Sequence, residues 1–136
     1  MYSKTTANIK VTVEPFYLDM HSAPDEQYYV WAYTVQLENM GADSVQLLNR
    51  YWRITDARGN VQEVSGAGVI GEQPVIEPGD AYEYTSGVPL HTSSGFMAGK
   101  YEMCPSHAKN DTEKENFWIE IPAFSLDSPH QKRRPN

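Results

Sequence analysis

Residues 27–39 alternate between two sets of side chains, and this pattern constrains the fold more than any other feature of the sequence. One set consists of large aromatic or aliphatic residues, namely Tyr29, Trp31, Tyr33, Val35 and Leu37. Successive side chains of a β-strand point to opposite faces, whereas a helix would distribute this set around its axis. The segment therefore predicts a long central strand with one buried face.

Similar segments follow along the rest of the chain, separated by turns that contain Gly, Pro and Asn. They predict strands at residues 9–18, 45–56, 61–65, 74–76, 81–88, 96–104 and 117–121. The alternation slips at Leu48 and Asn49, which predicts a bulge, and Pro78 with Gly79 predicts a type II turn. Because no segment has helical period, about eight short strands with such turns predict an antiparallel sandwich or barrel.

A short pattern around Tyr101 favours the sandwich over the barrel. Immunoglobulin domains have a corner tyrosine two residues before a core cysteine. In this sequence Tyr101 and Met103 are similar to that pair, with Met103 in place of the cysteine. Trp52, on an earlier predicted strand, is then expected to pack beneath this strand.

Composition limits the number of domains, the compartment and the partners. The 136 residues favour one domain, expected at residues 1–126, followed by a disordered tail at residues 127–136. The net charge of −7 would repel phosphate backbones, which argues against nucleic-acid binding. A single cysteine, Cys104, suits a reducing compartment. Without a signal-peptide stretch or a run of about 20 apolar residues, we expect a soluble cytoplasmic protein that does not enter membranes.

Taken together, these segments resemble the bacterial ApaG family from about residue 9 to about residue 126. The most specific parts of the resemblance are residues 47–56, 66–74, 78–79, 84–87, 97–103 and 121–126. The resemblance implies an all-β, immunoglobulin-like or fibronectin type III-like β-sandwich of about 7–8 antiparallel strands.

The resemblance implies less about function than about fold. Bacterial proteins of this family are linked by name to cobalt and magnesium efflux, without an established biochemical activity. Related domains in eukaryotic F-box proteins and in a polymerase-delta-interacting protein are thought to mediate protein–protein contacts. The resemblance thus implies a non-enzymatic accessory or protein-interaction module that is associated only indirectly with Co²⁺ and Mg²⁺ efflux.

A protein partner would use exposed aromatic rings or a free sheet edge of such a sandwich. Tyr28, Tyr51 and Trp118 are candidates for such rings if they face outward. Sheet edges can also pair across a two-fold axis, so a homodimer is an alternative assembly.

Gly66, Gly68 and Gly71 match the phosphate-binding pattern G-x-G-x-x-G. In dinucleotide-binding folds this turn opens a helix, but the β-branched residues 69–70 and the following Pro74 prevent a helix here. Two interpretations remain open. The glycine N–H groups could converge on an anion, or the glycines could allow the chain to cross between sheets.

The alternative function is therefore the binding of a small anion, a nucleotide or pyrophosphate at residues 66–71. Arg50 and Arg53 are the candidate partners for the negative charge, because a guanidinium offers a planar fork of donors. A phosphate-ester or anhydride hydrolase is less favoured, because the sequence has no tight carboxylate motif to hold Mg²⁺.

No metal site or catalytic constellation is recognisable in the sequence. The four histidines are dispersed, and Cys104 with His107 forms the one local metal-ligand spacing, whereas a closed zinc site needs four ligands. Ser93 and Ser94 lie near His91 but lack a nucleophile elbow. We therefore expect no catalytic residues, no metal and no cofactor.

Overall fold

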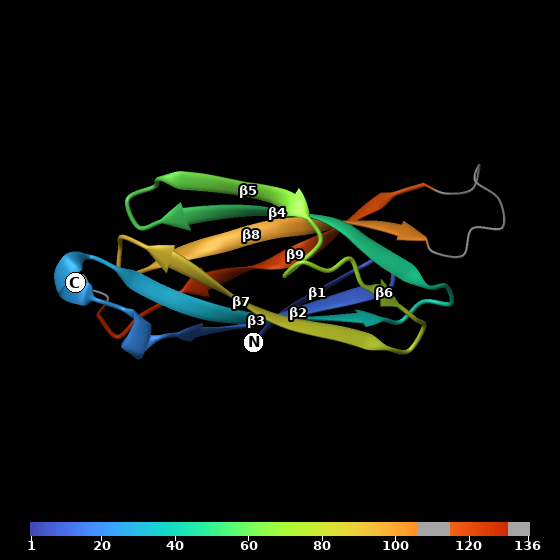
Figure 1. The fold of residues 1–136 in the computed structure, drawn as a ribbon, viewed down its shortest axis with the longest axis horizontal. Coiled ribbons are helices and arrows are strands. Elements are labelled where there is room, and N and C mark those ends of the chain that lie inside the picture. Colours follow the sequence, from blue (N-terminus) through green and yellow to red (C-terminus); the bar gives the residue numbers. More distant parts are fainter. Residues whose placement is uncertain (106–114, 131–136) are drawn as a thin grey trace.

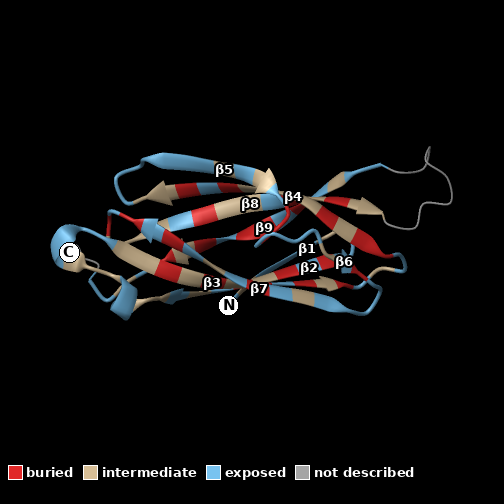
Figure 2. Cartoon of the chain, viewed as in Figure 1, coloured by how far each residue is buried: buried red, intermediate tan, exposed pale blue. Residues whose placement is uncertain are grey.

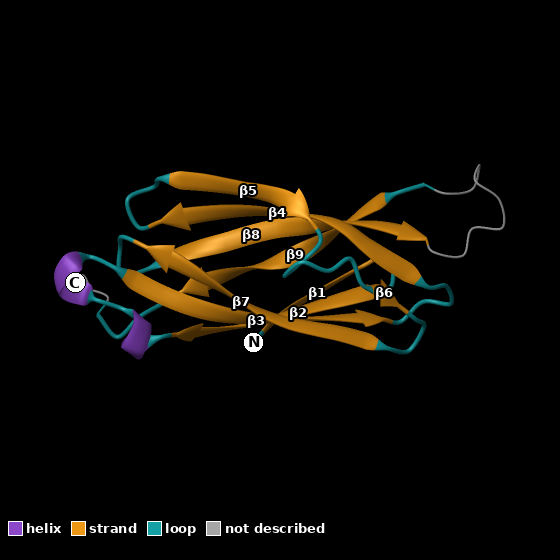
Figure 3. Ribbon diagram, viewed as in Figure 1, coloured by secondary structure: helices purple, strands orange, loops and turns teal. Residues whose placement is uncertain are grey.

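The computed structural model describes residues 1–105 and 115–130, which form two stacked antiparallel sheets (Figure 1). The strands are β1 (Tyr2–Thr6), β2 (Ile9–Tyr17), β3 (Tyr29–Asn39), β4 (Val45–Asp56), β5 (Val61–Ala67), β6 (Val75–Ile76), β7 (Ala81–Leu90), β8 (Gly95–Pro105) and β9 (Phe117–Leu126). Two short 3-10 turns, η1 (Asp19–His21) and η2 (Pro24–Glu26), lie between β2 and β3 (Figure 3). In these described residues, no helix has the length and apolar character to cross a lipid bilayer.

One sheet has the strand order β1-β2-β3-β7 and the other has the order β5-β4-β8-β9. β6 pairs with β4 at Val45 and Gln46, beyond the end of β5. The arrangement confirms the predicted all-β antiparallel sandwich, and each segment predicted as a strand forms one.

β1 is the strand that the sequence pattern did not predict. Its residues are mostly exposed, so it has no apolar face for an alternation to reveal. It forms because Ala7 and Asn8, with φ of 50° and 64°, turn the chain back along β2. Positive φ at both central residues is typical of the type I′ turn, whose twist suits a β-hairpin.

The core lies between the two sheets and includes the inner face of β3 (Figure 2). Trp31, Tyr33, Val35 and Leu37 are buried, which confirms the face predicted from the alternation. β3 has a hydrogen-bonded neighbour on each side, as expected of a central strand.

Trp52 lies at the centre of an aromatic cluster in this core. Its ring meets those of Tyr33, Tyr101 and Phe124 edge to face, at centroid distances of 5.3, 6.4 and 5.9 Å. The contact with Tyr101 confirms the expected packing. The likeness to a tyrosine corner stops there, because the Tyr101 hydroxyl hydrogen-bonds the Tyr84 hydroxyl and not a nearby backbone group.

The predicted bulge in β4 decides which side chains of that strand face the core. The register between β4 and β8 shifts between Leu47 and Asn49. Trp52 is buried beyond the bulge, so Arg50, two residues before it, points to the same inner side. Tyr51 then points outward.

The two long sides of the sandwich are built differently. On one side β1 lies against β9, where the Tyr2 and Ser125 hydroxyls are 2.9 Å apart and the Glu120 N–H donates to Thr6 Oγ1. On the other side β5 and β7 are the outer strands of different sheets. The segment after β5 meets β7 where the Tyr82 hydroxyl donates to the Glu72 carboxylate.

The chain stays packed on the sandwich beyond β9, as far as His130. Trp31 Nε1 donates to the Asp127 carbonyl at 2.8 Å, and the His130 ring lies edge-on to Tyr17 at 5.8 Å. Residues 127–130 therefore belong with the sandwich and not with a disordered tail. Residues 131–136, also expected in that tail, lie outside the described residues.

Candidate functional site

The glycine-rich segment after β5 forms a closed hairpin turn. Val69 and Glu72 exchange both backbone hydrogen bonds, at 2.8 and 2.9 Å, around a turn in which Gly71 has a φ of 80°. Gly68 also has a positive φ of 63°, and its N–H donates to the Leu48 carbonyl at 2.8 Å. The N–H groups of Gly68 and Val69 are thus engaged by acceptors within the protein.

A backbone contact requires glycine at position 68. A Cβ atom on Gly68 would lie 2.1 Å from the Glu72 carbonyl oxygen. That oxygen accepts the Val69 N–H, so a side chain at position 68 would force the turn apart. At Gly71 nothing lies within 4 Å of the Cβ position, and only the positive φ favours glycine.

Arg50 lies on the inner side of β4 and reaches across β5. Its Nη1 donates to the carbonyl oxygens of Ala67 and Gly68, at 3.0 and 2.9 Å. A Cβ atom on Gly66 would lie 2.9 Å from Arg50 Nη2, so the missing side chain of Gly66 leaves room for the guanidinium. The structure therefore brings Arg50, Gly66 and Gly68 together: the guanidinium lies over Gly66 and donates to the Gly68 carbonyl.

Arg53 and Gly71, the other candidate residues, lie apart from this group. Arg53 is exposed on the outer face of β4, opposite Glu63 in the register with β5. Gly71 lies at the tip of the hairpin turn. Side chains three residues apart on a strand point to opposite faces of the sheet, so Arg50 and Arg53 do not converge on one ligand.

The outer face of the β5-β4-β8-β9 sheet carries what we call the outer-face cluster, Tyr51, Lys100 and Trp118. Tyr51 of β4 lies directly opposite Lys100 of β8. Lys100 Nζ is 5.6 Å from the Tyr51 ring centroid and 4.6 Å from the Trp118 ring centroid. The ring faces attract the ammonium group, which holds the three side chains together at the surface.

A hollow of about 630 Å³ adjoins the outer-face cluster, and Asn49, Arg50, Glu102 and residues 65–67 complete its lining. Asn49 Nδ2 donates to Glu102 Oε1 at 2.7 Å, which fixes both side chains at the rim. On the β5 side, the Tyr51 hydroxyl donates to Glu63 Oε2 at 3.0 Å. This hydrogen bond raises the pKa of Tyr51.

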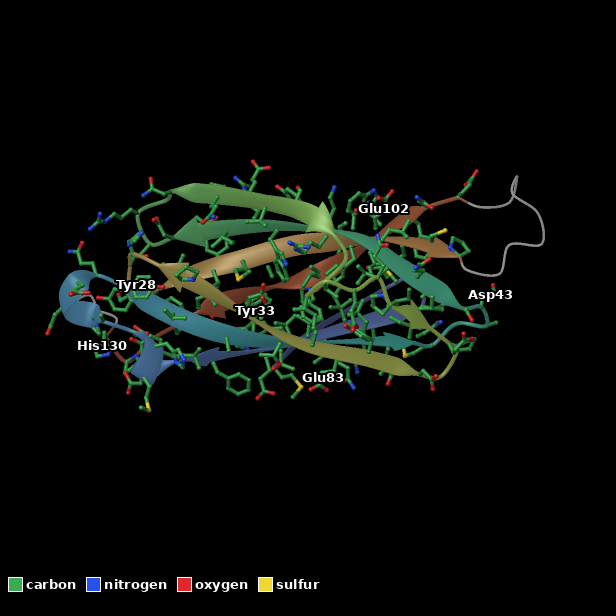
Figure 4. The ribbon with its side chains drawn as sticks, viewed as in Figure 1. Tyr28, Tyr33, Asp43, Glu83, Glu102 and His130 are labelled. Atoms are coloured by element: carbon green, nitrogen blue, oxygen red, sulfur yellow. The ribbon has the colours of Figure 1, made fainter. Side chains whose placement is uncertain are left out.

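Tyr51 and Trp118, two of the three rings singled out in the sequence, thus meet at one place. Trp118 is 44% exposed, as a contact residue would be. Tyr28 is exposed as well, but it lies toward the other end of the molecule, far from Glu102 (Figure 4).

Sequence reasoning missed Lys100, Asn49 and Glu102. A usable signal was present for two of them. Tyr101 is buried, so its neighbours Lys100 and Glu102 point to the outer face of the sheet. The position of Asn49 depends on the bulge, whose register the sequence does not define.

Three buried tyrosines, Tyr33, Tyr84 and Tyr101, lie between the sheets near Arg50. Burial raises the pKa of each phenol, and the nearby Arg50 charge lowers it by a smaller amount. The Tyr84 and Tyr101 hydroxyls are hydrogen-bonded to each other. Phenols that stay neutral at ordinary pH contribute hydrogen bonds and packing, and they do not act as bases.

The histidine and cysteine candidates do not converge in the described residues. Cys104 is half-buried beside the Pro105 carbonyl, and His107 lies outside the described residues. His91 Nδ1 is 3.4 Å from the Gln27 carbonyl. Across residues 1–105 and 115–130, no three His, Cys, Asp or Glu side chains are close enough to hold a metal ion.

These features define the class of the protein as a two-sheet antiparallel β-sandwich with a glycine hairpin and an aromatic–cation cluster on one sheet. The family model described as the ApaG domain matches residues 19–105. The chain belongs to the ApaG family, which confirms the resemblance seen in the sequence.

Relatives and a solved structure agree with this assignment. A protein named ApaG from Paramagnetospirillum magneticum is 60% identical over 136 residues, 100% of each chain. A protein of the same name from Brucella canis is 56% identical over 136 residues, again 100% of each chain. The crystal structure of a protein titled ApaA from Bordetella pertussis has a TM-score of 0.82 and 41% identity, covering 90% of this chain and 95% of that chain.

Proposed function

We propose that this ApaG-family domain is a non-enzymatic protein-interaction module whose partner binds at the outer-face cluster. The observation that carries the proposal is Lys100 held between Tyr51 and Trp118 beside the hollow of about 630 Å³. Tyrosine and tryptophan dominate the binding energy of many interfaces, because they bury a large area with little loss of side-chain freedom.

The cluster is held in place before any partner arrives, which favours binding. Tyr51 and Lys100 lie on two paired strands in the middle of the sheet, and the Tyr51 hydroxyl is fixed by Glu63. A side chain that is already ordered loses less entropy on binding than a mobile one. The rigid strands therefore support recognition better than a loop would.

The rim of the hollow indicates the chemistry of the partner. Glu102 offers a carboxylate, whose Oε1 accepts from Asn49 Nδ2 at 2.7 Å and whose Oε2 accepts from Asn116 Nδ2 at 3.3 Å, so a partner would meet a carboxylate with acceptor capacity left on each oxygen. A partner that places an apolar side chain over Trp118 and a donor near Glu102 would match both parts. The combination of an apolar centre and a polar rim is typical of protein interfaces.

Binding of a small anion, a nucleotide or pyrophosphate at residues 66–71 is a weaker proposal. The N–H groups of Gly68 and Val69 already have acceptors, and Arg50 Nη1 is directed at two carbonyl oxygens. A phosphate-ester or anhydride hydrolase is less supported still, because the described residues contain no group of three or more His, Cys, Asp or Glu side chains that could hold Mg²⁺. Under our proposal any connection with Co²⁺ or Mg²⁺ efflux is indirect and runs through the protein partner in the bacterial cytoplasm.

The test is affinity capture from a lysate of the protein's own bacterium with immobilised wild-type domain, Trp118→Ala and Phe16→Ala. Phe16 is the matched control, because it is 45% exposed against 44% for Trp118 and lies on β2 in the other sheet. We expect one protein to be recovered with the wild type and with Phe16→Ala, and to be lost with Trp118→Ala. Equal recovery with all three would contradict the proposal.

A thermal-shift experiment with pyrophosphate and ATP addresses the alternative. A ligand present at about 100 times its Kd stabilises the folded state by about 2.7 kcal/mol. Our proposal expects no shift. A shift of several degrees that disappears in Arg50→Ala would favour the anion site instead.

A further inference from the structure

We infer that the outer edge of β5 is a docking site for an extended segment of a partner protein, with apolar side chains on one of its faces and Lys or Arg on the other. The segment would add to the sheet as a new strand beside β5. The inference rests on the proposed function in that it takes a protein as the ligand. It adds a second surface, the strand edge, next to the outer-face cluster.

Half of the backbone groups of β5 point away from β4. The Gly68 N–H donates to the Leu48 carbonyl, and the Asp56 N–H donates to the Asn60 carbonyl. These two bonds lie at either end of the β4–β5 ladder and fix which residue pairs exchange hydrogen bonds.

Hydrogen-bonded and non-hydrogen-bonded residue pairs alternate along an antiparallel ladder. The backbone N–H and C=O groups of Gln62, Val64 and Gly66 therefore bond to β4. Val61, Glu63 and Ser65 therefore point their N–H and C=O groups away from β4. β5 has no strand on its other side, and the backbone groups of these three residues have no hydrogen-bond partner among the described residues.

The other outer strands carry Lys or Pro, which discourage strand addition, whereas β5 carries neither. Lys4 lies in the middle of β1, Pro89 lies in β7 and Pro122 lies in β9. Lysine and proline on an edge strand are common devices against pairing with another chain. β5 contains neither residue.

Arg50 sets the limit of the free edge. The Ala67 carbonyl points outward by the same alternation, and Arg50 Nη1 donates to it at 3.0 Å. The incoming strand is therefore expected to pair with Val61, Glu63 and Ser65 and to end before Ala67.

The two faces of a strand added beside β5 would meet different chemistry. On the inner side, a hollow of about 240 Å³ lies between β5 and β7 and is lined by Val64, Trp52, Val88 and Pro89, among others. Alternate side chains of an added strand would point into this space, so they should be apolar.

On the outer face the charged side chain of β5 is Glu63, which favours a basic residue in the partner. The net charge of the chain argues against a second copy as the occupant. Two β5 strands paired about a two-fold axis would bring together two chains that each carry a net charge of −7 and repel each other.

The experiment uses the full chain and a pool of nonapeptides with Val, Ile, Leu or Phe at alternating positions and Lys or Thr between them. A second pool has the same composition in scrambled order. Hydrogen exchange followed by NMR is the readout. We expect the alternating pool to slow exchange of the Val61, Glu63 and Ser65 amides by about tenfold or more, since each gains an acceptor. Failure of the pool to bind, or equal protection by the scrambled pool, would overturn the inference.

Two matched changes isolate the backbone pairing. N-methylation of the peptide at positions that face β5 should weaken binding at least about tenfold, whereas N-methylation at the intervening positions should leave binding unchanged. In the protein, Ser65→Pro should remove peptide binding and Ser65→Val should retain it. The Ser65 N–H is not used by β4, so proline removes only the edge donor. Equal effects of the two methylation patterns would overturn the inference even if Ser65→Pro fails to fold.

The outcome is separable from that of the proposed function. Loss of the captured partner in Trp118→Ala, with full retention in Ser65→Pro, would refute the strand-addition site and leave the outer-face cluster as the binding surface. Ser65 also lines the hollow beside the outer-face cluster, so Ser65→Val, which changes that side chain and keeps the backbone N–H, is the control. Loss in Ser65→Pro with retention in both Ser65→Val and Trp118→Ala would refute the outer-face cluster and leave the strand edge as the binding surface. A concentration-dependent dimer in sedimentation that disappears in Ser65→Pro would identify a second copy as the occupant and would refute a basic partner segment.

Discussion

Gly68→Ala should destabilise the domain by about 3 kcal/mol. A non-glycine residue at positive φ costs about 1–2 kcal/mol, and the φ of Gly68 is 63°. The new Cβ would lie 2.1 Å from the Glu72 carbonyl oxygen, so that oxygen must move away from the Val69 N–H. Each backbone hydrogen bond lost with the turn costs about 1 kcal/mol.

Urea denaturation measures this loss directly. With a slope on the order of 1.5 kcal/mol per molar urea, the midpoint should fall by about 2 M and the slope itself should not change. Gly71→Ala is the control, because Gly71 also has a positive φ, 80°, but has open space around its Cβ position. It should cost only about 1 kcal/mol. If Gly68→Ala is no more destabilising than Gly71→Ala, the argument from the Glu72 contact is refuted.

Three further predictions concern the interior around Arg50. Arg50→Ala removes two charge-assisted hydrogen bonds and should lower the free energy of unfolding by about 2 kcal/mol, with partial recovery in Arg50→Lys. A decrease below about 0.5 kcal/mol in urea denaturation would contradict this. Tyr84→Phe and Tyr101→Phe should each lower the free energy of unfolding by about 1–2 kcal/mol, because each leaves the partner's buried hydroxyl unpaired. The double variant should lose clearly less than the sum of the two, and additive losses would contradict the pairing. Burial raises the pKa of Tyr33, Tyr84 and Tyr101 above the ordinary value of 10.0, so the folded state holds protons that the unfolded chain releases first. The contribution of these three phenols to stability is fully present below pH 10.0 and decreases as the pH rises above it. A urea midpoint that stays constant between about pH 8 and about pH 11.5 would contradict this expected decrease.

Most of the fold was predictable because its signals are local. The aromatic alternation of β3, the turn at Pro78 and Gly79, and the slip at Leu48 each depend on a few neighbouring residues. β1 was missed because an exposed edge strand needs no apolar face, and its hairpin turn uses Ala7 and Asn8 instead of the more typical Asn-Gly.

The candidate site was less predictable, because side chains from separate strands meet only in the folded sheet. Arg50 and Arg53 were considered together, yet strand alternation directs them to opposite faces. Lys100 has no motif of its own and gains a role from lying opposite Tyr51 and beside Trp118. The sequence pattern of the glycines predicted an unusual backbone correctly, whereas the direction of their N–H groups depends on the Val69–Glu72 pairing.

The most direct test of the central claim is photo-crosslinking in living cells with a benzophenone amino acid at single positions. Tyr51 lies in the outer-face cluster, and Phe16 is a more exposed control on the other sheet. We predict one discrete protein adduct with the probe at position 51 and none with the probe at position 16. An adduct at position 16 alone, or the same adducts at both positions, would contradict the assignment of the outer face of the β5-β4-β8-β9 sheet as the binding surface.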